Sequence, residues 1–335
     1  ANHHPGPPMR LAVLADIHGN LPAFQSVLAE LERIQPDAVV VNGDLINPVP
    51  YNGEVIDYIR NTDWAVVRGN HEFYLLDFGT ERAIPGSEDP VRWGSLHWLV
   101  RNVSSEQAQY LAALPDERTL YFPATQPIRM AHGVPGRNRV GFYQQQPAEK
   151  ILLEIRDIPQ HTIISAHTHV QVDRQLCLPT ARDPLSNPHG EDGHYPPETG
   201  PQTGGYWHLL NPGSVGLPLE KDTRAAFAVL ESVPESVERG GWRVTHHRVE
   251  YDRRPALEAF STSGLLEAGG PIATIFYWEL VTAEPEIVDY YRWCHRNGYD
   301  ADGDLTGAFA AYVQATGRDA YVRQRDPLHN RALTR

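Results

Sequence analysis

The sequence predicts an α/β fold with four layers, an αββα sandwich of two mixed β-sheets flanked by helices, followed by a C-terminal helical appendage. Three observations support this prediction. Short apolar segments alternate with amphipathic ones as far as Pro115, strand-like segments dominate from there to Asp252, and helical spacing alone remains beyond it. Two sheets can bury one face each against the other, and helices can cover the outer faces.

The segment before Pro115 predicts a parallel sheet. Apolar runs indicate strands at residues 10–15, 38–41 and 64–67. Amphipathic spacing predicts helices, the first of them capped by Asn20, at residues 21–34, 54–60, 72–76, 91–103 and 106–114. Strands joined by helices pair in parallel, so the loops after their carboxyl ends lie along one edge of the sheet, where functional side chains are expected.

The segment after Pro115 predicts a second sheet. Runs rich in apolar and β-branched residues indicate strands at residues 119–122, 128–131, 162–166, 170–176, 206–210, 225–230 and 242–249. One helix is expected between them, at residues 148–156. This shift toward strands predicts a second sheet that packs against the first.

The chain divides into three parts in this interpretation. Residues 1–8 form a flexible N-terminal leader, residues 9–252 the main domain, and residues 253–335 the helical appendage. Residues 178–205 are dense in Pro, Gly, Asn and Asp, which indicates a mobile insertion within the main domain.

The appendage carries helical spacing at residues 285–299 and 305–316. Aromatic residues recur in the first of these segments, at Tyr290, Tyr291 and Trp293. We expect them in the core of the appendage, or in a contact between two copies of the chain in a homo-oligomer, rather than in a nucleotide pocket.

The composition indicates a globular protein and restricts its partners. Hydrophobic residues make up 41% and charged residues 21% of the 335 residues, near globular averages. The net charge of -13 argues against long nucleic acid as a partner. No apolar run approaches the ~20 residues that span a bilayer, so no membrane association is expected. Only Cys177 and Cys294 are present, which excludes a disulfide framework and favours the cytoplasm.

Polar motifs follow each of the first three predicted strands. Asp16 and His18 alternate after the first strand, Asp44 follows Gly43 after the second, and Gly69-Asn70-His71-Glu72 follows the third. Each motif alone is an ordinary turn sequence. Together they place carboxylate, amide and imidazole groups along one edge of one sheet.

The second half of the main domain supplies further imidazoles after predicted strands. His132 follows one strand, and His167 and His169 follow another at spacing i and i+2. With the three loops of the first sheet, they complete a mixed nitrogen and oxygen set that suits two divalent transition metals. The pattern therefore predicts a dinuclear metal site.

In this order, the motifs resemble those of the calcineurin-like metallophosphoesterase superfamily. The segments Ala15-Asp16-Ile17-His18-Gly19-Asn20 and Asn211-Pro212-Gly213-Ser214-Val215-Gly216 are similar to its YfcE-like phosphodiesterase branch. The resemblance covers residues 9–252, the expected metallophosphoesterase domain. It implies a cytoplasmic metal-dependent hydrolase of phosphoric esters, a phosphodiesterase or phosphatase.

The resemblance also implies a role for each motif residue. One ion would be held by Asp16, His18, Asp44 and His169, and the other by Asp44, Asn70, His132 and His167. Asp44 would bridge the two ions, and a metal-bridging hydroxide would attack phosphorus in line. His71 would act as general acid, which makes His71, Asn70 and Asp44 the catalytic residues. Manganese is expected first, with iron, zinc, cobalt or nickel as alternatives.

Five further residues are candidates for supporting roles or substrate contacts. Asn47 stands where relatives often carry Asp or His to orient the histidine equivalent to His71, and Glu72 is expected to compensate for the missing negative charge. Arg68 either grips a substrate phosphate or pairs within the fold. Arg137 is a phosphate contact or a solvated loop residue, and Asn211 belongs to a rigid turn near the site.

The expected substrate is a small phosphodiester or nucleotide derivative. Protein phosphatase and dinucleoside polyphosphate hydrolase activities are alternatives, although their longer motif is replaced by Gly43-Asp44-Leu45-Ile46-Asn47-Pro48. A non-catalytic metal-binding scaffold for protein contacts is a rival of a different class. A nuclease is the weakest alternative because of the acidic net charge.

Overall fold

The computed structural model describes residues 7–178, 205–233 and 240–333 of the chain. Most of the expected N-terminal leader, residues 1–6, and most of the expected insertion, residues 179–204, lie outside the described residues. Among the described helices, none combines the length and the apolar character needed to cross a membrane.

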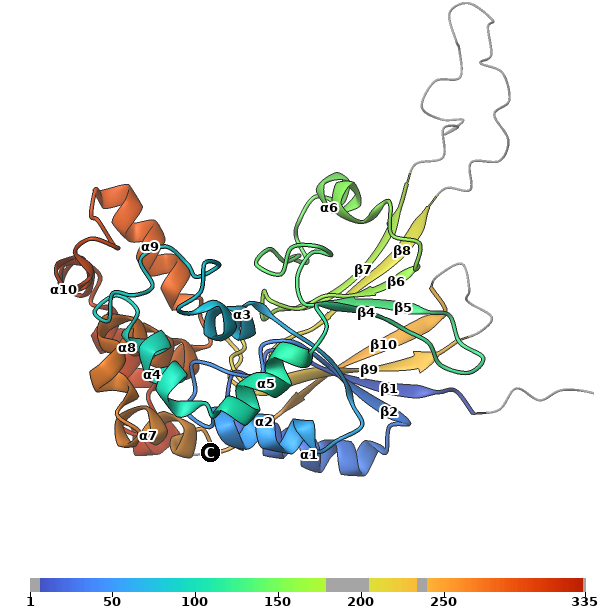
Figure 1. Ribbon diagram of the computed structural model, residues 1–335, viewed down its shortest axis with the longest axis horizontal. Coiled ribbons are helices and arrows are strands. Elements are labelled where there is room, and N and C mark those ends of the chain that lie inside the picture. The colour runs from blue at the N-terminus through green and yellow to red at the C-terminus, as the bar shows by residue number, and fades with distance from the viewer. Residues whose placement is uncertain (1–6, 179–204, 234–239, 334–335) are drawn as a thin grey trace, which may run out of the picture.

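The first sheet has the strand order β10-β9-β1-β2-β3 and is mixed (Figure 1). Its strands are β1 (Arg10–Leu14), β2 (Ala38–Asn42), β3 (Ala65–Val67), β9 (Ala225–Ser232) and β10 (Trp242–Val249). The first three pair in parallel, whereas β9 runs antiparallel to β1 and β10. The parallel pairing brings the carboxyl ends of β1, β2 and β3 to the same edge.

The second sheet has the order β4-β5-β6-β8-β7. Its strands are β4 (Glu117–Leu120), β5 (Ile128–Ala131), β6 (Thr162–Ile164), β7 (Gln171–Cys177) and β8 (Tyr206–Pro212). The central strands β5, β6 and β8 are parallel, and both edge strands are antiparallel to their neighbours. The loops after β5 and β6 therefore also share one edge.

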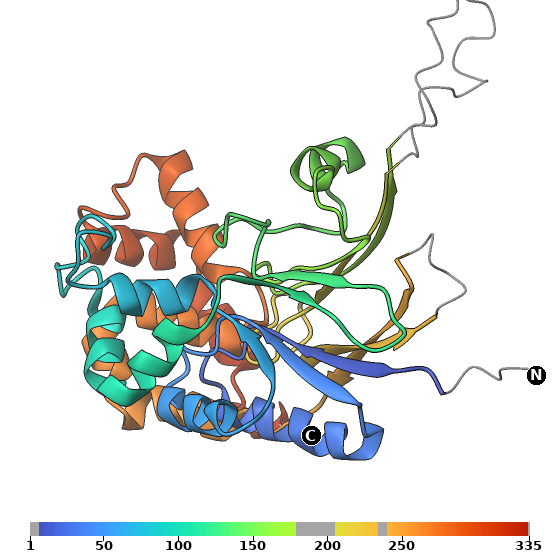
Figure 2. The same ribbon diagram turned by 45° about the vertical axis from the view of Figure 1, so that its right-hand side comes forward.

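Helices cover the outer faces of the two sheets, which confirms the four-layer prediction (Figures 1 and 2). On the first sheet lie α1 (Leu21–Ile34), α2 (Asn52–Arg60) and α5 (Ser105–Ala113), and on the second lies α6 (Ala148–Ile155). The period of two along β1 explains the layers. Leu11 and Val13 pack into the core between the sheets, while Ala12 and Leu14 pack into the core under the helices.

Two helices connect the first sheet to the C-terminal part of the chain. They are α3 (Asn70–Asp77), which starts directly after β3, and α4 (Gly94–Asn102). The helix expected at residues 91–103 starts later because residues 89–93 form hydrogen-bonded turns, in which Asp89 Oδ1 accepts the Val91 N–H at 2.9 Å.

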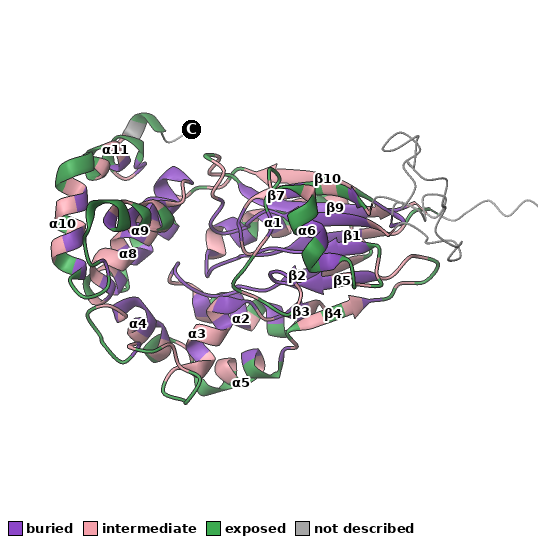
Figure 3. Cartoon of the chain, turned by 90° about the horizontal axis from the view of Figure 1, so that it is seen from above, coloured by how far each residue is buried: buried purple, intermediate pink, exposed green. Residues whose placement is uncertain are grey.

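The chain beyond residue 252 is helical and lies at one end of the two sheets (Figure 3). Its helices are α7 (Arg254–Thr262), α8 (Leu265–Thr282), α9 (Glu286–Asn297), α10 (Leu305–Thr316) and α11 (Arg318–Arg325), with a short 3-10 turn at Arg331–Leu333. The appendage has a core of its own, in which Tyr290 is fully buried. Pro271 lies inside α8 and accompanies a kink at Gly270, whose φ is 53°.

Candidate metal centre

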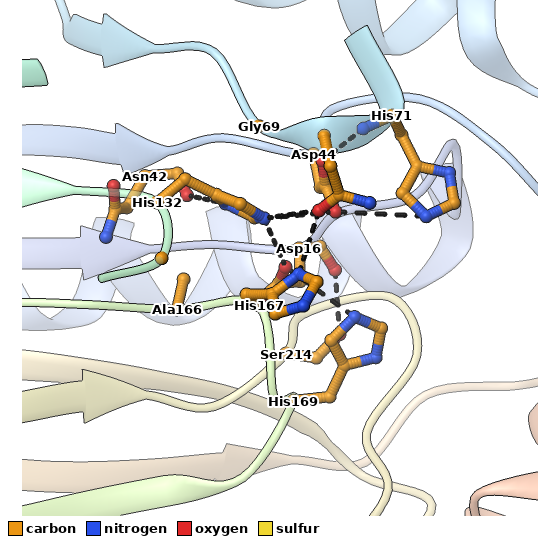
Figure 4. Close-up of polar contacts among 12 residues, drawn as sticks. Asp16, Asn42, Asp44, Gly69, His71, His132, Ala166, His167, His169 and Ser214 are labelled. Carbon is orange, nitrogen blue, oxygen red and sulfur yellow. Dashed lines mark hydrogen bonds and ion pairs between the residues drawn. The ribbon is translucent and has the colours of Figure 1, made fainter. Parts of the chain in front are cut away.

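Loops from both sheets converge on one buried site at the end of the sandwich that faces the appendage (Figure 4). Asp16 and His18 follow β1, and Asp44 follows β2. His132 follows β5, while His167 and His169 follow β6. Asn70 and His71 open α3, after β3. The structure thus brings the residues of all five motifs together.

Backbone hydrogen bonds tie these loops to one another. The Asp16 N–H donates to Gly43 O at 3.1 Å, and the His18 N–H donates to Asp44 O at 2.9 Å. In the second sheet, the Ala166 N–H donates to His132 O at 2.7 Å. Hydrogen bonds between the backbones of these loops therefore set the spacing of the polar side chains.

Five residues of the cluster adopt the left-handed backbone conformation that non-glycine residues rarely take. They have φ values from 51° to 71° and are Asp16, His18, Asp44, His167 and His169. Each such residue costs on the order of 1–3 kcal/mol, and strain of this kind concentrates at functional sites. Stability alone does not explain this conformation at five neighbouring polar residues.

Asp16, His18, Asp44 and His169 form one group of potential ligands, whose ligand atoms all lie within 4.8 Å of one another. His18 Nε2 and His169 Nε2 are 2.9 Å apart. Asp16 Oδ1 lies 3.6 Å from His169 Nε2, and Asp44 Oδ2 lies 3.8 Å from His18 Nε2. The group offers two carboxylates and two imidazoles to one central point.

Asp44, His132 and His167 form a second group that shares the Asp44 carboxylate. Asp44 Oδ2 lies 3.2 Å from His132 Nε2. The Asn70 amide oxygen joins them, since Asn70 Oδ1 lies 3.1 Å from His132 Nε2 and 2.8 Å from His167 Nδ1. The two groups therefore meet at one side chain.

The electrostatics of the cluster suit cations. Both carboxylate oxygens of Asp16 are buried and accept no hydrogen bond within the described part of the chain. Burial raises the pKa of the Asp16 carboxyl well above its usual range, and Asp44 adds to this effect. A buried carboxylate without a partner is costly unless a cation pairs with it. The donor set therefore fits divalent transition ions.

The pKa values of the buried imidazoles shift in opposite directions. Burial lowers the pKa of His167 to about 4 and that of His169 well below its usual range, which favours the neutral form that binds metals. Burial also acts on His132, but the Asp44 and Asp16 carboxylates outweigh it and raise its pKa to about 10.

Backbone carbonyl groups hold three of the imidazoles by their Nδ1 atoms. His132 Nδ1 lies 2.7 Å from Asn42 O, and His169 Nδ1 lies 2.6 Å from Leu217 O. His18 Nδ1 is similarly bonded to a carbonyl oxygen, that of Asn47. A carbonyl partner at Nδ1 fixes the tautomer and leaves Nε2 directed into the cluster. Sequence reasoning missed these partners because carbonyl groups carry no sequence signal.

His71 lies beside the two groups rather than within them. Its Nε2 is 4.0 Å from Asp44 Oδ2, and its backbone N–H donates to Asp44 Oδ1 at 2.9 Å. The Asn47 amide nitrogen lies 2.9 Å from His71 Nδ1. An amide donor at Nδ1 places the proton of the neutral imidazole on Nε2. Burial lowers the pKa of His71 to about 3.

The expectation that Glu72 compensates for the missing charge beside His71 is wrong. The Glu72 carboxylate instead accepts three backbone N–H groups, from Asp44 at 2.9 Å, Leu45 at 2.7 Å and Gly69 at 2.6 Å. Burial, together with the Asp44 charge, raises the pKa of Glu72 to about 7. Its contacts hold the Asp44 loop against the start of α3.

Glycine at position 69 allows this close approach. A Cβ there would lie 2.1 Å from Asp44 Oδ1, so any side chain would displace the shared carboxylate. Ala166, which precedes His167 in the other sheet, needs no such freedom because the positive φ begins one residue later, at His167.

The other supporting candidates are engaged within the fold. Arg68 pairs with Asp116 at 2.6 Å, which decides between its two expected roles in favour of pairing within the fold. Arg137 pairs with Glu154 at 2.5 Å and is half-exposed. Asn211 is buried, and its Nδ2 donates to Ala166 O at 3.1 Å, so it braces the loop that carries His167 and His169.

A family model matches this chain over the part that carries all five motifs. The model is that of the calcineurin-like phosphoesterases, and it matches residues 9–176, which is half of the chain. The chain belongs to the calcineurin-like phosphoesterase family. The predicted resemblance to this superfamily is thereby confirmed, as is the prediction of a metal-dependent phosphoric ester hydrolase.

Individual relatives of this phosphoesterase family member are distant. An uncharacterized protein, MJ0912 of Methanocaldococcus jannaschii, is 23% identical over 272 residues, which cover 77% of this chain and 94% of that protein. A crystal structure of a metallophosphoesterase from Sphaerobacter thermophilus has 25% identity and a TM-score of 0.55, with 82% of this chain and 100% of that chain covered.

A second solved structure shares the fold. It is the hypothetical protein PH1004 from Pyrococcus horikoshii, with 19% identity, a TM-score of 0.59, and coverage of 80% of this chain and 98% of that chain. These matches extend beyond the residues of the family model and include much of the chain after residue 176.

Proposed function

We propose that this phosphoesterase is a dinuclear metal-dependent phosphodiesterase that hydrolyses small phosphodiesters or nucleotide derivatives. The observation that carries the proposal is the sharing of Asp44 between two groups of potential ligands. A shared carboxylate would offset the repulsion between two dications bound side by side.

The ligand sets of the proposal follow the two groups of side chains. Asp16, His18, Asp44 and His169 would hold one ion, and Asp44, Asn70, His132 and His167 would hold the second. Bound divalent ions supply a nucleophile at neutral pH and offset the negative charge of the phosphoryl group. Manganese is the first choice, with iron, zinc, cobalt or nickel as alternatives.

His71 is the proton donor to the leaving oxygen in this proposal. The Asn47 amide at its Nδ1 keeps the proton on Nε2, on the side of Asp44. Its pKa of about 3 keeps His71 neutral at neutral pH before substrate binds. A phosphate anion beside the ring favours the charged imidazolium form and thus raises this pKa.

The strongest rival is a metal-binding scaffold without catalysis. A scaffold needs the metal ligands but has no use for His71, its amide partner Asn47, or a proton on Nε2 facing the cluster. The presence of all three favours the enzyme. Among the residues that the structure describes, no feature favours protein phosphatase or dinucleoside polyphosphate hydrolase activity over the phosphodiesterase.

Four further predictions accompany the proposal. The placement in the YfcE-like branch rests on the motifs around Asp16 and Asn211. A cytoplasmic location rests on the presence of only two cysteines. Association of two copies through the appendage, and the division at residues 9–252 and 253–335, likewise stay predictions.

Hydrolysis of an aryl phosphodiester in the presence of manganese tests the function. The native protein should be active, and His71→Ala should lower kcat by about 100- to 10,000-fold while its manganese content is unchanged. The matched control is His329→Ala, since His329 is half-exposed and lies on the appendage. This control should keep native activity.

Two outcomes contradict the proposal. A native protein that binds two ions but hydrolyses no diester would support the scaffold. Undiminished kcat in His71→Ala would remove His71 as the proton donor.

A further inference from the structure

A cavity of about 270 Å³ opens beside His71 and is lined by residues other than the proposed metal ligands. Asn47 and His71 lie at one end of it. Its volume is slightly below the range of about 300–1,000 Å³ for pockets that hold drug-sized ligands. It therefore has room for one ring system rather than for a polymer.

The walls of the cavity come from two parts of the chain. Tyr74 on α3 and Trp93, directly before α4, form the side that belongs to the main domain. The opposite side consists of appendage residues on α8 and α9: Ile272, Phe276, Ile287 and Tyr291. Tyr291 packs on the appendage core, as expected, and also lines this cavity.

A close contact between α4 and α8 fixes the two walls relative to each other. A Cβ at Gly94 would lie 1.9 Å from Ala268 O, so only glycine permits this approach. Arg92 adds an ion pair across the same boundary, to Asp302 at 2.8 Å. The cavity is thus a built part of the fold, since both contacts hold the appendage in place.

The lining is mostly apolar but contains two unused polar groups. Trp93 Nε1 and Ser95 Oγ are buried atoms without a hydrogen-bond partner among the described residues. Both residues line the cavity. The Arg92 guanidinium is already paired with Asp302 and lies 5.4 Å from the centre of the Trp93 ring. The cavity therefore offers aromatic walls and two groups able to donate hydrogen bonds, without a free charge.

We propose that this cavity holds the leaving alcohol of the substrate and that this alcohol carries a flat ring with hydrogen-bond acceptors, as a nucleoside does. The inference rests on the proposed function. Because His71 gives its proton to the leaving oxygen, the group attached to that oxygen lies on the His71 side of the phosphorus. The cavity is the space that lies there.

The aromatic residues that line the cavity indicate that the leaving alcohol carries a flat ring. Bases stack on aromatic side chains largely regardless of their identity, and Tyr74, Trp93, Phe276 and Tyr291 surround the space. Acceptor atoms on the ring edge satisfy Trp93 Nε1 and Ser95 Oγ, whose burial without partners is otherwise costly. A plain aliphatic alcohol would leave both groups unpaired.

Binding of unphosphorylated alcohols to the manganese-loaded protein tests the cavity apart from the chemistry. Adenosine, phenol and ribose are compared by titration calorimetry. Adenosine should bind more tightly than phenol, and ribose should bind most weakly. Phe276→Ala should weaken adenosine at least about fivefold. Phe309→Ala is the matched control, because Phe309 packs in the appendage core without lining the cavity, and should bind adenosine as the native protein does.

A second variant tests the hydrogen bonds. Trp93→Phe keeps an aromatic ring but removes the Nε1–H, so it should weaken adenosine by about threefold or more and leave phenol unchanged. Equal affinity for adenosine and phenol in the native protein would overturn the inference of ring acceptors. Equal affinity for adenosine in the native protein and in Phe276→Ala would overturn the cavity as the binding site.

The failure of this inference can be distinguished from failure of the proposed function. Adenosine should also inhibit hydrolysis of an aryl phosphodiester competitively. Hydrolysis without adenosine binding would leave the phosphodiesterase standing and overturn the cavity. Adenosine binding at the cavity without hydrolysis of any diester would overturn the phosphodiesterase, and with it the role of the cavity as a leaving-group site.

Discussion

Buried acids occur in two regions of the molecule, and the regions treat them differently. In the appendage, Arg318 pairs with Glu284 at 2.5 Å and with Glu286 at 2.7 Å. Tyr321 donates to Glu284 and Thr282 to Glu286, so each carboxylate has several partners. In the metal centre, the equally buried Asp16 carboxylate accepts no hydrogen bond within the described chain.

The acids of the appendage are paired within the fold, whereas the Asp16 carboxylate needs a bound cation to offset its charge. An arginine beside Asp16 would offset the charge of its carboxylate, as Arg318 does for Glu286. The metal centre instead surrounds its carboxylates with imidazoles, which are neutral ligands when a metal is bound. The following predictions test this difference, from the largest expected effect to the smallest.

Removal of the metal should lower the free energy of unfolding of the protein. This loss should come from the metal centre and not from the appendage. Saturation of two sites at about 100 times their Kd adds about 5 kcal/mol, or a Tm shift of about 5–10 °C. Differential scanning fluorimetry with a chelator or with added manganese measures the shift. Asp16→Asn removes a ligand from one of the two proposed ion sites, so about half of the manganese-dependent shift should disappear. A full shift in this variant would contradict the role of Asp16.

Removal of the Arg318 guanidinium should destabilise the appendage without changing the metal content of the protein. Arg318→Ala removes the cation that pairs with the buried Glu286 carboxylate and should lower the free energy of unfolding by about 2–3 kcal/mol, measured by urea denaturation. Arg292→Ala removes an exposed ion pair with Asp289 and should cost less than about 1 kcal/mol. An equal loss of unfolding free energy in Arg318→Ala and Arg292→Ala would show that the buried ion pair stabilises the protein no more than the exposed one does.

A third buried acid, Glu279, should make stability depend on pH. Burial raises its pKa from 4.5 to about 8, with Glu286 and Asp289 adding to the shift. Between these pH values the unfolded chain ionises Glu279 while the folded chain keeps it protonated, so this residue lowers stability as pH rises. Glu279→Gln removes that effect and retains the oxygen that accepts the Ile287 N–H.

The Tm of Glu279→Gln should therefore exceed that of the native protein by an amount that grows from pH 5 to pH 8, on the order of 1–3 kcal/mol in stability at the upper end. A difference in Tm that stays constant over this range would mean that Glu279 does not titrate as proposed.

Local sequence signals were sufficient to predict the layers of the fold. The alternation along β1 places Leu11 and Val13 on one face and Ala12 and Leu14 on the other, and the structure uses both faces. Asn20 caps α1 as expected, accepting the Ala23 N–H at 3.2 Å. These features depend on neighbours in sequence, so a pattern can reveal them.

The convergence of the polar motifs was also predictable, because carboxyl ends of parallel strands meet at one edge. Contacts made across long stretches of chain were not. The bond from Glu72 to the Leu45 N–H and the pair between Arg68 and Asp116 depend on how loops approach in space. The cavity lined by Tyr291 depends on the contact of α4 with α8, which no local pattern encodes.

Metal stoichiometry tests the central claim, that one carboxylate joins two ion sites, most directly. Elemental analysis of protein loaded with manganese and desalted should find two ions per native chain, and Asp44→Asn should lose both ions or retain one weakly. The control Asp222→Asn, which alters a carboxylate paired with Arg224, should keep two. Two tightly bound ions in Asp44→Asn, or no bound ion in the native protein, would contradict the account.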